Sequence, residues 1–200
     1  MLEPEQTESA AKECLVRRVF CGLLGAAAIC AAAACDERQP TSVTQPTPSG
    51  NAITSDSALF RQISQTDPLQ NYAVFPSTEE FTTGRLNGSD AHRTVVRVRI
   101  NAVAAAALRN GKLPAGTSFP AGSVILKEIR AASGAPISVY AVLYKDPTSA
   151  MAAKGWLWAE FNPDGRSVYS INARGGACTS CHSLEQGRTN DLVRTFERQQ

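Results

Sequence analysis

The clearest chemical signal in this sequence is the run Cys178-Thr179-Ser180-Cys181-His182. Two cysteines three positions apart lie on one side of a helical turn, so both thiols can form thioether bonds to the vinyl groups of one haem. A histidine at the next position can turn its imidazole onto the iron as the proximal ligand. The motif therefore predicts one covalent haem c, anchored by Cys178 and Cys181 and ligated by His182. The glycines just before the motif would let the chain approach a flat macrocycle.

Two other uses of this cysteine pair agree less well with the sequence. A structural zinc ion takes four ligands. Beyond residue 35, the cysteines and histidines are limited to this motif and His92, and adjacent Cys181 and His182 rarely bind one ion together. A thioredoxin-like redox pair stands near the amino end of a βαβ unit, whereas this pair lies about twenty residues from the carboxyl end. Covalent haem is therefore the favoured interpretation.

The second axial ligand decides what a haem can do. A small electron-transfer cytochrome places a methionine after the motif, but no methionine or histidine follows His182 in this chain. Elsewhere the candidates are His92 and Met151. We expect Met151 to pack against a short helix and His92, in a polar loop, to be a surface residue. The sequence thus predicts a five-coordinate iron with an open position for a small molecule.

The amino end has the pattern of an export signal. Arg17 and Arg18 precede residues 19–34, a short run of small apolar residues that is too short and too rich in alanine for a confident membrane span. Three alanines before Cys35 resemble a bacterial lipobox, although its usual leucine is absent. We expect residues 1–35 to be a signal peptide, with Cys35 lipidated as the first mature residue or with plain cleavage nearby.

The rest of the chain divides into a linker and one domain. Residues 36–54 are rich in Thr, Pro and Ser and predict a flexible linker, followed by a domain over 55–200. Once the signal is removed, Cys178 and Cys181 are the only cysteines beyond Cys35, so no disulfide framework is available. The expected location is the bacterial periplasm, on the membrane if Cys35 carries lipid. The net charge of +2 gives no reason to expect nucleic acid as a partner.

Periodicity predicts an α+β fold. Strands are expected over 94–100, 123–130, 137–145, 156–161 and 166–172, and helices over 55–65, 101–109, 146–153 and 191–198. Residues 69–90 are expected to be irregular. Short connections between consecutive strands favour a mostly antiparallel sheet with flanking helices and a C-terminal haem-binding helix. Alternation predicts that Arg97 and Arg99 lie on a solvent-exposed face of the first strand.

Several segments together resemble the cytochrome P-460 family. They are 119–128 (FPAGSVILKE), 140–146 (YAVLYKD), 155–158 (GWLW), 178–182 (CTSCH) and 191–196 (DLVRTF). The resemblance implies an antiparallel sheet, a c-type haem near the carboxyl end, and an open distal side. It also implies a covalent bond from a lysine to the haem edge, together with hydroxylamine oxidation. Lys127 is at the position similar to that lysine. Alternation places it with Ile125 and Ile129, although an ordinary lysine of a sheet edge would fit the strand too.

The chain departs from this family pattern at the distal side. The family's enzymes use a distal carboxylate, whereas the matching region around Ala141 is apolar, and the family's arginine is hard to place. Related proteins of the same fold lack the lysine bond and bind nitric oxide or carbon monoxide. We therefore expect redox chemistry on a small nitrogen compound such as hydroxylamine, with gas binding or sensing and electron transfer as alternatives. Whether the protein is an enzyme stays open, and a redox partner protein and a homodimer are compatible with the sequence.

Overall fold

The computed structural model describes residues 52–75, 81–83, 92, 95–184 and 190–195. The chain divides into two compact units, Met1–Gln45 and Pro46–Gln200, and every described residue lies in the second. The predicted signal peptide, the lipidation site Cys35 and most of the predicted linker lie outside the described residues. Within the described ranges, no helix is long and apolar enough to span a membrane.

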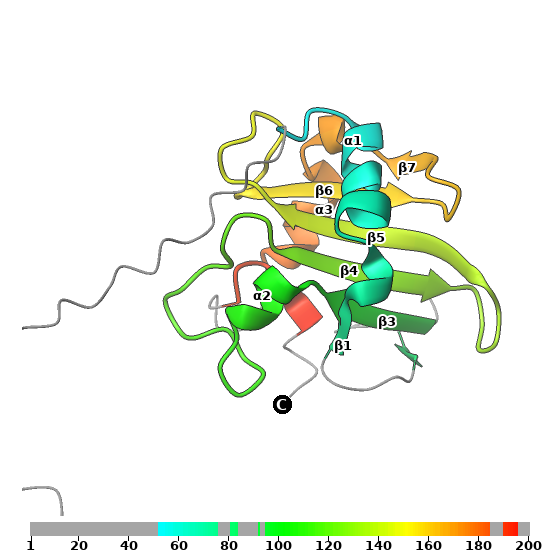
Figure 1. Cartoon of the computed structure of the whole chain (residues 1–200), viewed down its shortest axis with the longest axis horizontal. Helices are drawn as coiled ribbons and strands as arrows, with labels where there is room; N and C mark the ends of the chain where they lie inside the picture. Colours follow the sequence, from blue (N-terminus) through cyan, green and yellow to red (C-terminus); the bar gives the residue numbers. More distant parts are fainter. Residues whose placement is uncertain (1–51, 76–80, 84–91, 93–94, 185–189, 196–200) are drawn as a thin grey trace, which may run out of the picture. The chain divides into compact units, whose positions relative to one another are not determined.

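The domain is built on one antiparallel sheet (Figure 1). Its strands are β1 (Ala73–Phe75), β2 (Thr82–Thr83), β3 (Val95–Ile100), β4 (Val124–Arg130), β5 (Ile137–Lys145), β6 (Trp156–Phe161) and β7 (Ser167–Tyr169). The order across the sheet is β1-β3-β4-β5-β6-β7, and β2 also pairs with β3. Strands β3 to β6 agree with the sequence prediction, and the α+β class with a mostly antiparallel sheet is confirmed. The short strands β1 and β2 were not predicted.

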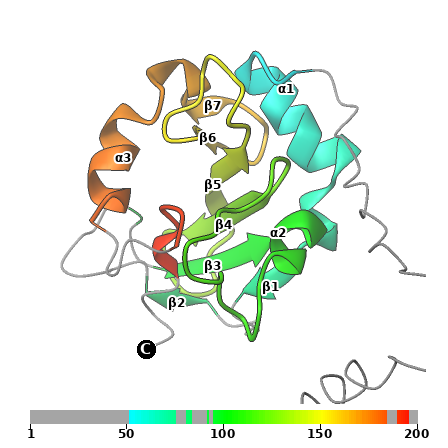
Figure 2. The ribbon, with the colours of Figure 1, turned by 90° about the vertical axis from the view of Figure 1, so that its left-hand side faces the viewer.

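Short helices flank the sheet (Figure 2). Helix α1 (Asp56–Arg61) begins after Ser55, whose side chain accepts a hydrogen bond from the amide of Ala58, and it continues as a π-helix, η2 (Gln62–Thr66). Helix α2 (Ala102–Ala106) is capped in the same way by Asn101. Two 3-10 turns, η3 (Leu69–Asn71) and η4 (Ile171–Ala173), and helix α3 (Gly176–His182) complete the domain. Helix α3 carries the cysteine motif, and its binding of haem remains a prediction.

The two faces of the sheet are both covered, each by a different set of elements. One core cluster joins Leu59 and Ile63 of the α1 region to Leu126, Leu157 and Phe161 of the sheet. The other contains the opposite-face side chains of the same strands, with the half-buried Cys178 of α3 packed against them. Figure 2 shows α1 and α3 on opposite sides of the sheet. Alternation along each strand thus separates a face under α1 from a face under α3.

The face of β3 that carries arginines is not solvent-exposed, which corrects the sequence prediction. Arg97 donates a hydrogen bond to Glu128 of β4, and Arg99 forms an ion pair with the same carboxylate at 3.2 Å. Both arginine side chains are only 16% exposed. A buried carboxylate needs such partners because its charge would otherwise be desolvated without compensation.

Two predicted helices are wrong in the structure. Residues 146–153 form turns, because Oδ1 of Asp146 accepts hydrogen bonds from the amides of Thr148 and Ser149 and fixes a local turn instead. Asp191 does not start a helix either, since Asp191 and Leu192 have φ angles of 51° and 69°. The end of that predicted helix, at 196–198, lies outside the described residues.

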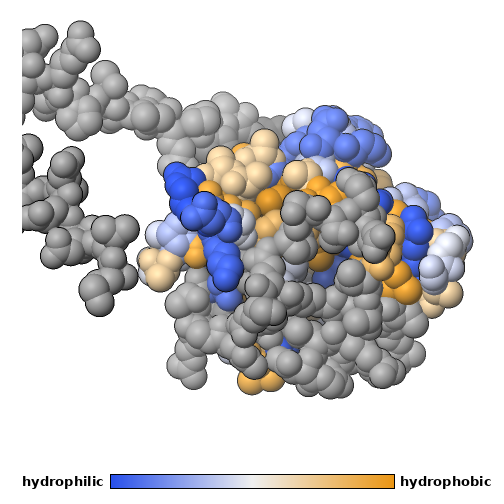
Figure 3. All heavy atoms as spheres, turned by 90° about the horizontal axis from the view of Figure 1, so that it is seen from below, coloured by the Kyte–Doolittle hydropathy of each residue, from blue (hydrophilic) through white to orange (hydrophobic). Residues whose placement is uncertain are grey.

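Hydrophobic surface on the described part is scattered. In the view of Figure 3, hydrophobic residues are visible between hydrophilic ones. The large hydrophobic side chains that are exposed within the described ranges are Val103, Val168 and Leu184, which lie on or beside three different elements. Single exposed residues of this kind are ordinary on protein surfaces and do not by themselves indicate a binding site.

Candidate functional site

Helix α3 is positioned by a close contact between its first turn and the sheet. Gly175, which precedes the helix, has a φ angle of +63°, and a Cβ there would lie 2.6 Å from Cδ1 of Trp158. A residue with a side chain would therefore be strained and would collide with a buried tryptophan. From the sequence, we expected the glycines before the motif to allow the chain to approach the haem. In the structure, Gly175 allows α3 to pack directly on β6.

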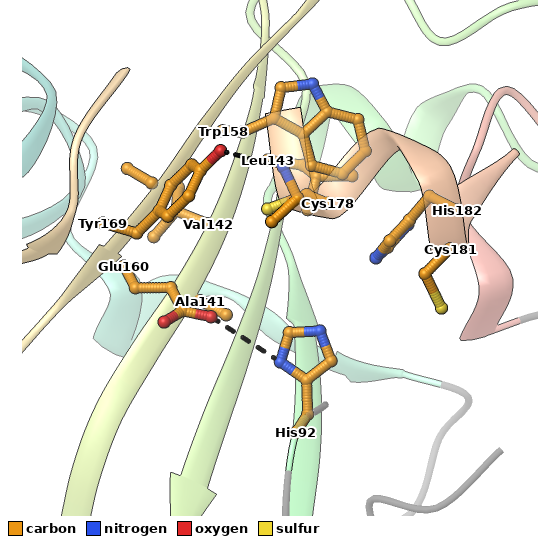
Figure 4. A pocket seen from close by; sticks show the side chains of 12 residues that line it. His92, Ala141, Val142, Leu143, Trp158, Glu160, Tyr169, Cys178, Cys181 and His182 are labelled. Atoms are coloured by element: carbon orange, nitrogen blue, oxygen red, sulfur yellow. Dashed lines mark hydrogen bonds and ion pairs between the residues drawn. The ribbon is translucent and has the colours of Figure 1, made fainter. Parts of the chain in front are cut away.

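A partly open pocket of about 230 Å3 lies between α3 and the sheet (Figure 4). The wall from α3 includes Cys178, Cys181 and His182, and the facing wall comes from β5, β6 and β7. His92 closes one side. The remaining lining residues are Ala141, Val142, Leu143, Trp158, Ala159, Glu160, Tyr169 and Ala177. All three residues that the sequence motif assigned to haem therefore line the same pocket.

His182 is held in one orientation. Its Nδ1 lies 2.6 Å from the carbonyl oxygen of Leu192. Because a carbonyl oxygen only accepts, Nδ1 is protonated, so that in the neutral ring Nε2 carries the lone pair. Figure 4 shows a nitrogen of this ring pointing into the pocket. The ring also stands edge-on to Trp158, with 4.9 Å between ring centroids. This is the arrangement of a metal-ligating histidine, whose second nitrogen is bound by a backbone or carboxylate oxygen.

The carbonyl of Leu192 is itself fixed by a buried ion pair. Nζ of Lys145 lies 2.7 and 2.8 Å from the two carboxylate oxygens of Asp191. The same residue accepts hydrogen bonds from the indole of Trp156 and the amide of Phe119, each at 2.9 Å. These contacts hold Asp191 and Leu192 in left-handed backbone conformations. The segment after α3 thereby presents its carbonyl to His182.

The two cysteines are free thiols of intermediate burial. Burial, with the nearby Glu160 carboxylate, raises the pKa of Cys178. The thiol of Cys181 is 3.0 Å from a guanidinium nitrogen of Arg194, which also donates to the carbonyl of Cys181 at 3.2 Å. Both cysteines line the pocket and neither is in a disulfide, which thioether formation requires.

Lys127 belongs to the row of side chains that forms the floor of the pocket. In the strand registers, Lys127 lies opposite Ala141, Ala141 opposite Glu160, and Glu160 opposite Tyr169. Cross-strand neighbours point to the same face of a sheet, and the last three line the pocket. The half-buried Lys127 is not in the lining itself. Burial raises the pKa of Glu160 and lowers that of His92, and the positive charge of Lys127 opposes the first shift and adds to the second. The predicted face of Lys127, shared with Ile125 and Ile129, is confirmed.

Glu160 is a functional candidate that the sequence analysis missed. It supplies a carboxylate beside Ala141 from the neighbouring strand, whereas Ala141 itself has an apolar side chain. Burial raises its pKa, and the charge of Lys127 opposes that rise. A signal was present in the sequence, because alternation along 156–161 puts Glu160 on the face of Trp156 and Trp158. Only the register between β5 and β6, however, brings it to Ala141.

His92 is the second missed candidate, and the expectation of a surface residue is wrong. Its side chain is 20% exposed and lines the pocket opposite His182. Burial lowers its pKa to about 3, with contributions from the charges of Lys127 and His182, so the ring is neutral near pH 7. Its Nδ1 lies 3.8 Å from Oε1 of Glu160 (Figure 4). A loop histidine gives no periodic signal from which this position could be predicted.

The donor set of the pocket fits a c-type haem. Cys178 and Cys181 offer two unbridged thiols from successive turns of one short helix. His182 offers an imidazole with a nitrogen that points into the same space. Leu143 and Trp158 add buried apolar surface, which suits a flat hydrophobic macrocycle. These residues would hold the group by two thioether bonds and one iron–nitrogen bond.

Comparison with known proteins agrees with this donor set. No curated protein sequence matches the chain significantly. The family model described as cytochrome P460 matches residues 75–195. This range is more than half of the chain and contains strands β2 to β7, Lys127, Glu160 and the whole cysteine motif. The chain therefore belongs to the cytochrome P460 family.

Proposed function

We propose that this haem protein carries one covalently attached haem c and performs redox chemistry on a small nitrogen compound such as hydroxylamine. Family membership makes it a cytochrome, and the proposal goes further to the attachment and the reaction. The observation that carries the reaction is the half-buried carboxylate of Glu160 in the pocket, in one cross-strand row with Lys127. The sequence argued against hydroxylamine oxidation because the region around Ala141, where the family's enzymes have a carboxylate, is apolar. Glu160 supplies a carboxylate next to Ala141 from the neighbouring strand.

Oxidation of hydroxylamine requires that the substrate lose both electrons and protons. Cys178, Cys181 and His182 would hold the haem, which would supply the redox centre for the substrate's electrons, and an external acceptor would take these electrons up. In this proposal Glu160 accepts a proton from a substrate bound between it and His182, and the support is that both residues line the same cavity. Partial burial raises the pKa of Glu160, and the charge of Lys127 opposes that rise and favours the ionised form. Small apolar side chains such as Ala141 leave room for a compact substrate.

Replacing Glu160 by glutamine tests this role. The amide keeps the size of the side chain but cannot accept the proton, so we expect hydroxylamine oxidation with an artificial electron acceptor to fall by about 100-fold or more. The haem content should not change. Asp164→Asn, at an exposed position on the hairpin between β6 and β7, is the matched control and should keep full activity. Equal activity of Glu160→Gln and the parent protein would exclude Glu160 as the proton acceptor.

Lys127 is proposed as the haem cross-link or as a distal-side residue. Two observations support this proposal: the family resemblance, and the position of Lys127 in one cross-strand row with Ala141 and Glu160, which line the pocket. If the cross-link exists, Lys127→Ala should change the optical spectrum and should leave the haem bound through thioethers alone, as peptide mass mapping would reveal. Lys112→Ala, at an exposed position, should leave both unchanged. A Lys127→Ala protein with the parent spectrum and an intact mass altered only by the substitution would rule out the cross-link.

Gas binding without turnover is the second candidate. The observation in its favour is the apolar character of the lining from Ala141, Leu143 and Trp158, which suits nitric oxide or carbon monoxide. The two functions separate in one experiment, since a binder would take up nitric oxide but show no steady-state oxidation of hydroxylamine. Simple electron transfer is disfavoured because no methionine follows His182.

The proposed location is the bacterial periplasm, with a lipid anchor at Cys35 where lipidation occurs. Support comes from the sequence: Arg17 and Arg18 before a short apolar run, small residues before Cys35, and a haem motif that is normally loaded after export. A redox partner protein that accepts the electrons, and a homodimer, belong to the same proposal.

A further inference from the structure

The positions of His92 and His182 relative to each other are the starting observation. They lie on opposite sides of the pocket (Figure 4), with 6.3 Å between ring centroids and 87° between ring planes. His92 comes from the segment before β3, whereas His182 ends α3, so the fold brings the two rings together from distant parts of the chain. In the described part of the chain, no other histidine occurs.

This separation matches a pair of axial ligands. A metal–imidazole bond is about 2 Å long, and the bonding nitrogen lies about 1 Å from the centre of its ring. Two imidazoles that bind one metal ion from opposite sides therefore have ring centres roughly 6 Å apart. The observed distance leaves room for one iron between the rings.

The orientation of both rings also suits ligation. Nδ1 of His182 is engaged by the carbonyl oxygen of Leu192 at 2.6 Å. Nδ1 of His92 faces Oε1 of Glu160 at 3.8 Å, and within the described residues it has no hydrogen-bond partner at closer range. In each ring, Nε2 is the nitrogen on the side away from these oxygens. An oxygen behind the non-ligating nitrogen is the usual support of a metal-bound histidine.

The burial of His92 needs an explanation that a purely structural role does not give. A buried ring nitrogen without a hydrogen bond costs free energy. The neighbours on the floor of the pocket include Ala141 and Leu143, which offer no polar side-chain group. The nitrogen without a partner is Nδ1, which faces Glu160. An iron bound at Nε2 would make the N–H at Nδ1 a stronger donor towards that carboxylate, as in other metal-bound histidines.

We propose that His92 is the sixth ligand of the haem iron in the resting protein, and that a small ligand or substrate binds by replacing it. The proposal rests on haem binding by Cys178, Cys181 and His182 and not on hydroxylamine oxidation. It replaces the sequence expectation of a permanently five-coordinate iron. The family resemblance implies an open distal side of the haem, whereas in this proposal His92 occupies that side until a ligand replaces it.

The test is the spin state of the purified haem protein and its change in His92→Ala. We expect the parent protein to be low-spin in optical and electron paramagnetic resonance spectra, as two imidazole ligands require. His92→Ala should be high-spin, and millimolar imidazole should restore the low-spin spectrum. Tyr169→Phe, which changes another lining residue but removes no nitrogen ligand, should stay low-spin.

Carbon monoxide binding to the reduced protein gives a second, kinetic measurement. Displacement of His92 limits the rate in the parent protein, so the observed rate should reach a plateau as the carbon monoxide concentration rises. In His92→Ala it should increase linearly and exceed the parent rate at least tenfold. A high-spin parent protein, or a low-spin His92→Ala protein, overturns the proposal. The parent spectrum decides even if the variant does not fold, and purification without haem would instead reject the haem site itself.

Discussion

Replacing Cys178 and Cys181 together by serine is expected to yield a protein with no covalently bound haem. Both cysteines line one pocket and neither is in a disulfide, and each thioether bond uses one of the two sulfur atoms. The intact mass of the double variant should equal that of the polypeptide alone, and haem staining after denaturing electrophoresis should disappear. Each single variant should keep one thioether bond and therefore part of the staining.

Ser180→Ala is the matched control for this experiment. Ser180 lies between the two cysteines, is exposed, and its hydroxyl only donates to the carbonyl of Ala177. Its removal should leave the haem content unchanged. Covalent haem retained by the double serine variant would show that Cys178 and Cys181 are not the anchors.

Lys145→Met is expected to cause the largest loss of stability. The substitution removes the partner of Asp191 from a pair whose side chains are only 7% and 10% exposed. A buried carboxylate without its partner lowers the free energy of unfolding by about 3–5 kcal/mol. The urea midpoint of unfolding measures this change. Because Asp191 positions the segment whose carbonyl engages His182, the haem spectrum should change as well.

Two further variants make the Lys145 experiment specific. Adding Asp191→Asn to Lys145→Met removes the buried charge, and asparagine tolerates a positive φ, so part of the lost stability should return. Arg166→Met breaks the Arg166–Asp164 pair, whose side chains are 77% and 56% exposed, and should have no measurable effect. A Lys145→Met protein as stable as Arg166→Met would contradict the structural role of the ion pair.

The part of the site that local patterns determine was predictable. Strands β4, β5 and β6 follow from alternation, and β5 and β6 have the predicted bounds. The spacing within 178–182 is a local property, and the structure places it on one helix beside one pocket. The face of Lys127 could be predicted for the same reason, since alternation along one strand does not depend on the neighbouring strands.

The rest depends on contacts between distant segments, which no local pattern contains. Glu160 reaches the pocket floor through the register of β5 and β6, and a shift of one residue would turn it to the other face. Arg97 and Arg99 resemble solvent-exposed residues until β4 places Glu128 between them. His92 lies in the pocket only because the chain before β3 passes opposite α3.

The same limits explain the wrong helices. The Asp146–Pro147 pair has the composition of a helix start, but the carboxylate of Asp146 closes a turn by binding the amides of Thr148 and Ser149. Asp191 also has the chemistry of a helix cap. Its partners are instead Lys145, Trp156 and Phe119, and these tertiary contacts override the local preference.

The most direct test of the account is the intact mass and optical spectrum of the protein purified from a host that matures c-type cytochromes. The account predicts the mass of the processed polypeptide plus one haem, retained under denaturing conditions, with the absorption bands of a haem protein. A protein that purifies from such a host at the mass of the polypeptide alone, without haem absorption, would contradict the central claim that Cys178, Cys181 and His182 form a haem c site.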